Sequence, residues 1–199
     1  MKLNKTMILV PLLIIVVVSL SGCITDDFIK TGETYESNGI TFQYPESWHV
    51  VKSVAEGSVG AVASKNNSEI STVIQQVPAE LGTDIQSACS NNNKNLVKSP
   101  NYINLQEIKS SVNGNPVILH RYIVNEADGS QKEHVATWIQ MSDGKLYVVL
   151  FNTPLDQYEK QRSSYDLIVG TFALQSDSKT NNSSLQAQIM EKINSFFSN

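Results

Sequence analysis

The sequence predicts an α+β domain with a central antiparallel β-sheet flanked by helices on both faces. Several segments alternate apolar and polar residues and are joined by tight-turn dipeptides such as Asn38-Gly39 and Asp143-Gly144. The segments on either side of Asp143-Gly144 are largely apolar on both faces, which is typical of a sheet covered on both sides. Two further segments, around Cys89 and after Pro154, repeat apolar residues at helical spacing and can supply that cover.

The first 22 residues predict a lipoprotein signal peptide. Lys2 and Lys5 form a positively charged start, residues 7–18 form an apolar run, and Leu20-Ser21-Gly22-Cys23 is a lipobox with small residues before the cysteine. We therefore expect cleavage before Cys23, lipidation of its thiol and attachment to the extracytoplasmic face of the cell membrane. An uncleaved transmembrane anchor is the alternative, although residues 7–20 are shorter than the roughly 20 residues that span a bilayer.

Charge and cysteine content limit the classes of function. Without residues 1–22, the 15 basic residues lose Lys2 and Lys5, so 13 face 19 acidic residues and the formal net charge becomes −6. This balance argues against binding to nucleic acid and against a polybasic attachment to lipids. Cys89 is the one cysteine after Cys23, so no disulfide is expected, and its helical apolar spacing predicts a buried side chain.

The domain is expected over residues 33–174, joined to Cys23 by a tether over 23–32. A first hairpin over 34–44 turns at Asn38-Gly39 and sets Tyr35 opposite Phe42. Pro45 then breaks the strand, and strands follow at 48–54, 58–64 and 69–77. After the Pro-Glu-Ser turn, Trp48 is expected to cap the core rather than to serve as an exposed ligand platform.

The second half of the domain is expected to begin with a helix from a Thr83 or Asp84 cap to about residue 98, which its asparagines make weak. Strands follow at 102–112, 116–124, 133–141 and 145–151, and a helix begins after Pro154. A two-residue turn at Asp143-Gly144 sets Val135, Thr137, Ile139 and Met141 on one face with Leu146, Val148 and Leu150. One core is expected to contain Phe42, Trp48, Ile139, Val148 and Tyr165.

A polar linker over 175–184 is expected to lead to an amphipathic helix over 185–199. Its apolar stripe is a candidate docking surface, formed by Leu185, Ile189, Ile193, Phe196 and Phe197. The stripe can meet its own domain, a partner protein or the membrane. The membrane is least favoured, because the polar face with Glu191 and Lys192 is not rich in cations.

Residues 39–48, with the sequence GITFQYPESW, resemble the opening of PsbP-like domains, in which a strand ends in proline and a tryptophan follows three residues later. Tyr165, Ile168 and Phe172 resemble the last helix of that family. The resemblance implies a PsbP-like α/β/α sandwich. It also implies a mostly non-catalytic role, because family members are extrinsic subunits or assembly factors of photosynthetic complexes, with many prokaryotic lipoprotein relatives of unknown role. It supplies no catalytic residue.

The chemistry-bearing residues do not form a recognisable catalytic or metal motif. The chain lacks G-x-S-x-G and H-E-x-x-H, and it has too few cysteines for a thiolate cluster. His120 and His134 lie on adjacent expected strands, so the two side chains can approach each other across the hairpin. Alternatively, a symmetric loop between these strands sets His120 opposite Val135 and places the two imidazole rings on opposite faces of the sheet. Three acidic residues lack calcium-loop spacing and predict a solvated hairpin tip: Glu126, Asp128 and Glu133.

Three asparagines fit N-glycosylation acceptors in polar segments: Asn66, Asn181 and Asn182. No catalytic residue, metal or other cofactor is expected. The predicted function is therefore a membrane-anchored, non-catalytic binding or assembly module at the cell surface. The alternatives are an enzyme with an unrecognised site and a structural envelope protein. A deep pocket with several titratable groups would favour the enzyme, and a shallow apolar groove would favour binding.

Overall fold

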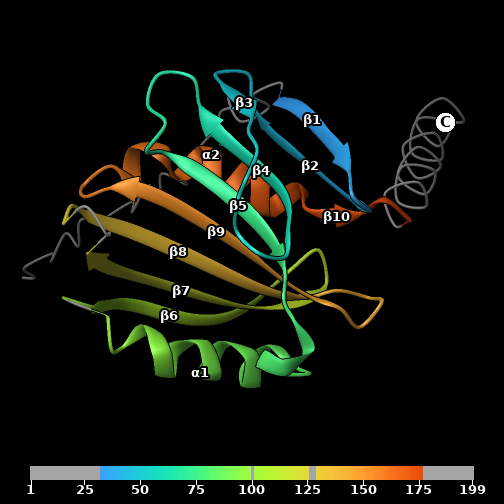
Figure 1. The fold of residues 1–199 in the computed structure, drawn as a ribbon. Helices are drawn as coiled ribbons and strands as arrows, with labels where there is room; N and C mark the ends of the chain where they lie inside the picture. Colours follow the sequence, from blue (N-terminus) through green and yellow to red (C-terminus); the bar gives the residue numbers. More distant parts are fainter. Residues whose placement is uncertain (1–31, 100, 126–128, 177–199) are drawn as a thin grey trace, which may run out of the picture. The chain divides into compact units, whose positions relative to one another are not determined.

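The computed structural model describes residues 32–99, 101–125 and 129–176. These residues form a mixed α/β fold with a large antiparallel sheet and two α-helices, which confirms the predicted fold class at that level (Figure 1). The large sheet has seven strands in the order β3 (Trp48–Val50), β4 (Ser58–Ser64), β5 (Ser71–Gln76), β9 (Leu146–Pro154), β8 (Gln131–Gln140), β7 (Asn115–Asn125) and β6 (Ile103–Val112). Cys23 and residues 177–199 lie outside the described residues.

The first hairpin belongs to a second sheet, with the order β1 (Gly32–Ser37), β2 (Ile40–Pro45) and β10 (Ala173–Leu174). Its turn is the predicted one, because Asn38 and Gly39 both take positive φ, at 52° and 80°. Tyr35 pairs with Phe42 as expected, and their rings stack with centroids 4.8 Å apart. Strand β10 was not predicted, since two residues are too few to show a periodic pattern.

The predicted two-residue turn between β8 and β9 is wrong. Met141 N–H donates to Lys145 O at 2.9 Å and Gly144 N–H donates to Met141 O at 3.0 Å, so residues 142–144 form a three-residue loop. Gly144 has φ 80°, which is the left-handed conformation that such a loop uses. The additional residue shifts the register by one position and exchanges the faces of β9 relative to β8. Trp138 therefore pairs with Val148, and Ile139 pairs with Tyr147.

This register divides the interior into two clusters. The first contains four of the five predicted core residues: Phe42, Trp48, Ile139 and Tyr165. The fifth, Val148, lies in the second cluster together with Trp138, Ala88 and Cys89. The prediction of a single core is therefore wrong for Val148, because the longer loop points this side chain to the other side of its strand.

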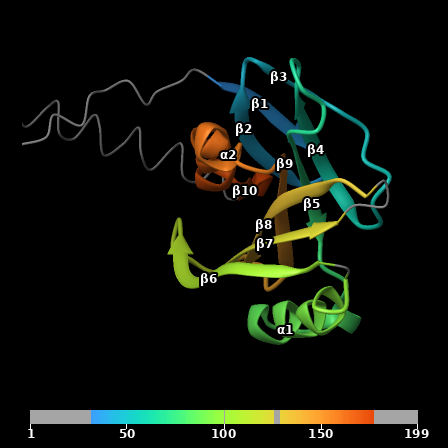
Figure 2. The ribbon, with the colours of Figure 1, turned by 90° about the vertical axis from the view of Figure 1, so that its left-hand side faces the viewer.

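Helix α1 (Ile85–Leu96) begins at the predicted Asp84 cap, where the Asp84 carboxylate accepts a hydrogen bond from Ser87 N–H at 2.8 Å. Helix α2 (Tyr158–Thr171) begins later than predicted, because Asp156 takes a positive φ of 62° after Pro154. Helix α1 contacts β7 and β8, whereas α2 contacts β2 and β9 (Figure 2). Within the described ranges, no helix has the length and apolar character needed to cross a membrane.

Candidate functional site

A pocket of about 420 Å³ opens between β5, α1 and the short 3-10 helix η1 (Ala79–Leu81). Trp138 and Val148 form its floor, because the register of β8 and β9 places them side by side. The walls come from the end of β5 and from the helical segments: Gln75, Gln76, Val77, Pro78, Leu81 and Asn92. Glu56 and Gly57 complete the rim.

Backbone hydrogen bonds fix the walls of this pocket. Val77 N–H donates to Leu146 O at 2.9 Å, and Pro78 is the N-cap residue of η1. On the rim, Gln76 N–H donates to Gly57 O at 2.9 Å, and Gln75 Nε2 donates to Glu56 O at 2.7 Å. Gly57 has φ +71°, and a Cβ there would lie 2.9 Å from Gln76 O, so this position requires glycine. These hydrogen bonds therefore fix the rim residues Glu56 and Gly57 to β5.

Trp138 contributes a buried hydrogen-bond donor to the pocket. It is 3% exposed, and its indole Nε1–H has no hydrogen-bond partner among the residues that the structure describes. A buried donor without an acceptor costs free energy, and a bound group that offers an oxygen can recover it. The floor of the pocket thus combines a large apolar surface with one buried donor.

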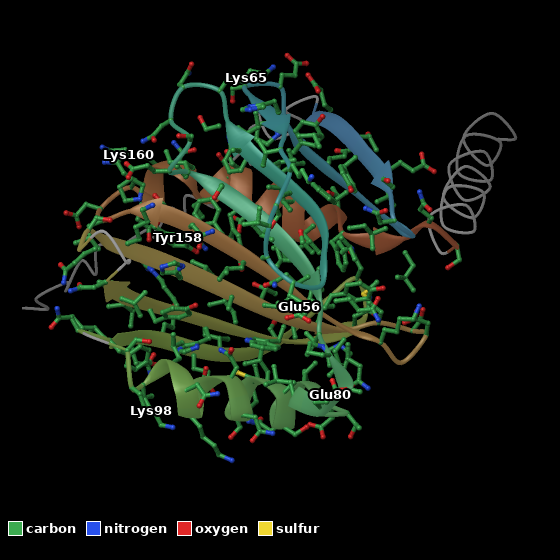
Figure 3. The ribbon with its side chains drawn as sticks, viewed as in Figure 1. Glu56, Lys65, Glu80, Lys98, Tyr158 and Lys160 are labelled. Carbon is green, nitrogen blue, oxygen red and sulfur yellow. The ribbon has the colours of Figure 1, made fainter. Side chains whose placement is uncertain are left out.

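Among the described residues that line the pocket, a single one is ionisable. This residue is Glu56, which Figure 3 shows on the loop before β4. Acid–base or nucleophilic catalysis requires several titratable groups that converge on one point. A mostly apolar lining with one carboxylate at the rim is more typical of a binding site.

His120 and His134 lie on the same face of the large sheet as this pocket. His120 pairs with Ala136, so the alternative that placed it opposite Val135 is wrong. The Tyr122 ring lies next to both histidines: it stacks on His134 with centroids 5.2 Å apart and is tilted against His120 with centroids 4.8 Å apart. Tyr102, directly before β6, has its Oη 3.1 Å from His120 Nε2 and completes a row of packed rings with β7 and β8. In the described ranges, no group of three metal-ligating side chains could hold a metal ion.

Burial controls the ionisation of the groups near this row. It lowers the pKa of His120 below its usual value, although the carboxylate of Glu107 partly opposes this shift. It also raises the pKa of the Cys89 thiol to about 11. Cys89 is almost completely buried, as its sequence spacing predicted, so it is a packed core residue and not a reactive thiol.

The predicted solvated acidic tip is wrong for Glu133. This side chain is buried, and it accepts a hydrogen bond from Arg121 Nε. The Arg121 guanidinium lies 4.0 Å from the centre of the Tyr158 ring, which ties β7 and β8 to α2. Glu126 and Asp128 lie outside the described residues.

The remaining predicted site residues are not brought to the pocket. Asn66 is exposed on the loop between β4 and β5. Cys23, Asn181, Asn182 and the stripe over 185–197 lie outside the described residues. Sequence reasoning missed the pocket, since its floor depends on the register of β8 and β9; Pro78 directly after a strand was the one local signal of a wall.

Several solved structures share this fold. The cyanobacterial PsbP protein of Synechocystis has 18% identity and a TM-score of 0.52, over 73% of this chain and 94% of that one. The Ran-binding protein Mog1p of Saccharomyces cerevisiae has 12% identity and a TM-score of 0.53, over 73% and 96%. LpqN of Mycobacterium tuberculosis, described as involved in cell envelope biogenesis, has 11% identity and a TM-score of 0.50, over 72% and 85%.

Comparison by sequence assigns the family, whereas the solved structures above show a shared fold. No curated protein sequence matches the chain. The family model of PsbP, in contrast, matches residues 31–174, which is most of the chain and includes both core clusters. The chain therefore belongs to the PsbP family.

Proposed function

We propose that this protein is a non-catalytic binding module that is held by a lipid on Cys23 at the extracytoplasmic face of the membrane and binds a partner protein. The observation that carries the proposal is the pocket beside α1, which has an aromatic floor, fixed walls and one ionisable lining residue. The fold supports the same role, because it is shared with Mog1p, which is described as a Ran-binding protein.

The lining specifies the kind of group that the pocket accepts. Trp138, Val148, Val77 and Leu81 offer apolar surface, and the free indole N–H of Trp138 requires an acceptor. An apolar side chain of the partner, with its neighbouring backbone carbonyl directed at Trp138, meets both requirements. A pocket of this volume holds one large side chain and part of its backbone.

Site-specific crosslinking in cells tests the pocket. A photoreactive amino acid at Leu81, which lines the pocket, should crosslink to one discrete partner protein, whereas the same group at the exposed neighbour Glu80 should not. Asn92→Trp fills the pocket from α1 and should remove the crosslink. Asn95→Trp is the matched control, because Asn95 is exposed on the same helix outside the lining. Equal crosslinking in the Asn92→Trp and Asn95→Trp variants would exclude the pocket as the binding site.

Membrane fractionation tests the lipid anchor. Cys23→Ser removes the acceptor thiol of the lipobox, so the protein should leave the membrane fraction or accumulate elsewhere in the cell. If the variant stays in the membrane fraction at the mass of the precursor, the segment is a spanning anchor instead.

A further inference from the structure

Among the residues that the structure describes, strand β6 forms a long unpaired edge of the seven-stranded sheet. It pairs with β7 on one side and is the last strand in the sheet order, whereas the opposite edge strand, β3, has three residues. Nine of its ten residues are exposed and the tenth, Val112, is half-buried. Figure 2 shows β6 as the outermost strand of its sheet, above α1. The outer N–H and C=O groups of such an edge can pair with another strand.

The regular part of β6 alternates charged and uncharged side chains between its two faces. A bulge lies between Asn104 and Gln106, and the register is regular from Gln106 to the end of the strand. In this regular part, Ile108 is 40% exposed, and it is flanked by Glu107 and Lys109 on the other face of the sheet. Neither Glu107 nor Lys109 makes an ion pair within the part of the chain that the structure describes.

We propose that two copies of this chain associate by antiparallel pairing of their β6 strands around a two-fold axis at Ile108. In this register Ile108 of one copy lies against Ile108 of the other. Glu107 then lies opposite Lys109 of the second copy, and the two-fold axis repeats this pair. Gln106 and Ser110 pair on the other face, and all five central positions fall within the regular part of the strand.

The charges of Glu107 and Lys109 favour this register and favour a second copy of the chain as the partner of β6. With an axis perpendicular to the sheet, the neighbouring symmetric registers centre on Glu107 or Lys109 and place like charges directly opposite each other. Only the register centred on Ile108 pairs opposite charges. The stripe over 185–197 does not match this surface, because its spacing predicts a helix, and a helix cannot complete a strand edge. The inference is independent of the pocket, which β6 does not line.

Disulfide trapping of the full-length chain in cells tests the register. Ile108→Cys should form a covalent dimer on mild oxidation, because directly opposite residues have Cβ atoms about 5 Å apart. Leu105→Cys is the matched control: Leu105 is exposed to a similar extent, at 43%, but it lies three residues from the axis, about 20 Å from its symmetry mate. The unsubstituted chain measures the background from Cys23 and Cys89. Equal trapping of both variants, or trapping of neither, would overturn the proposal.

Charge reversal provides a second, independent test. Glu107→Lys and Lys109→Glu each place two pairs of like charges at the interface, so each should weaken self-association about tenfold. The double variant Glu107→Lys/Lys109→Glu restores opposite pairs and should return to within about twofold of the original chain. Thermal midpoints show whether the variants remain folded. If the double variant associates no better than the single variants, or if β6 instead crosslinks to a different protein, the edge does not pair with itself.

Discussion

The two tryptophans of the chain are both almost completely buried, but they belong to different core clusters. Trp48 stacks against Phe151, with ring centroids 6.3 Å apart, in the cluster that contains residues of α2. Trp138 forms the floor of the pocket in the cluster that includes α1. The first is therefore a core residue away from the pocket lining, and the second can also contact a ligand.

Trp48→Ala should lower the free energy of unfolding by about 3–5 kcal/mol, because the side chain is 1% exposed and its loss leaves a cavity. Chemical denaturation measures the change. Val54→Ala is the control, since Val54 is 99% exposed and its truncation should have almost no effect. An unchanged midpoint for Trp48→Ala would show that this ring is not part of the core.

The buried imidazole of His120 should make stability depend on pH. Burial lowers its pKa in the folded state, so below the usual value of 6.5 the unfolded chain binds a proton that the folded chain does not. Stability should therefore fall as the pH decreases from above 6.5 toward the lowered pKa. Urea unfolding at pH 7.5 and about pH 5.5 measures this loss, which should be smaller in His120→Asn. An equal loss in both proteins would assign the pH dependence to other groups.

At the scale of elements, helix α1 is held by its ends and its packing rather than by its composition. Its central residues include three consecutive asparagines, which are poor helix formers. Ala88 and Cys89 are its buried residues, and they pack against the sheet. The capping box at Asp84 satisfies amide groups at its first turn. Because α1 forms one side of the pocket, its stability also maintains the candidate binding site.

Asp84→Ala should lower the thermal midpoint by about 2–4 °C, because it removes the acceptor for Ser87 N–H. Asp84→Asn should retain nearly all of the stability, since asparagine caps helices as well as aspartate does. Differential scanning calorimetry compares the two variants. A similar loss in both would mean that the charge of Asp84, and not its hydrogen bond, stabilises the helix.

At the scale of the whole molecule, the two core clusters are drawn from residues 40–174 and lie on either side of the same central strands. The large sheet is shared by both clusters, because neighbouring residues of β8 such as Trp138 and Ile139 point in opposite directions.

Because α2 and Phe172 already belong to the first core cluster, deletion of residues 176–199 should leave the thermal midpoint nearly unchanged. It should weaken any interaction that uses the stripe over 185–197. Calorimetry and binding measurements on the same variant separate the two effects. A fall of more than about 8 °C, or roughly 2–4 kcal/mol, would make this segment part of the core.

Local chemistry in the sequence determined several features without reference to the fold. Asn38-Gly39 specified its hairpin because both residues tolerate positive φ, and Asp84 specified a helix start because its side chain reaches an amide three residues later. The apolar spacing around Cys89 predicted its burial, and the segment over 39–48 identified the family. Each of these signals lies within about ten residues of chain.

Only the tertiary structure decided the candidate site. One additional residue in the loop over 142–144 reversed the faces of β9, and that choice set Val148 beside Trp138 at the floor of the pocket. Similarly, only the fold brings buried Glu133 to its partner Arg121 on the adjacent strand, whose guanidinium lies over the Tyr158 ring of α2. Because both faces of β8 and β9 are apolar, hydrophobic pattern could not distinguish the two registers, and packing against α1 and α2 had to select one.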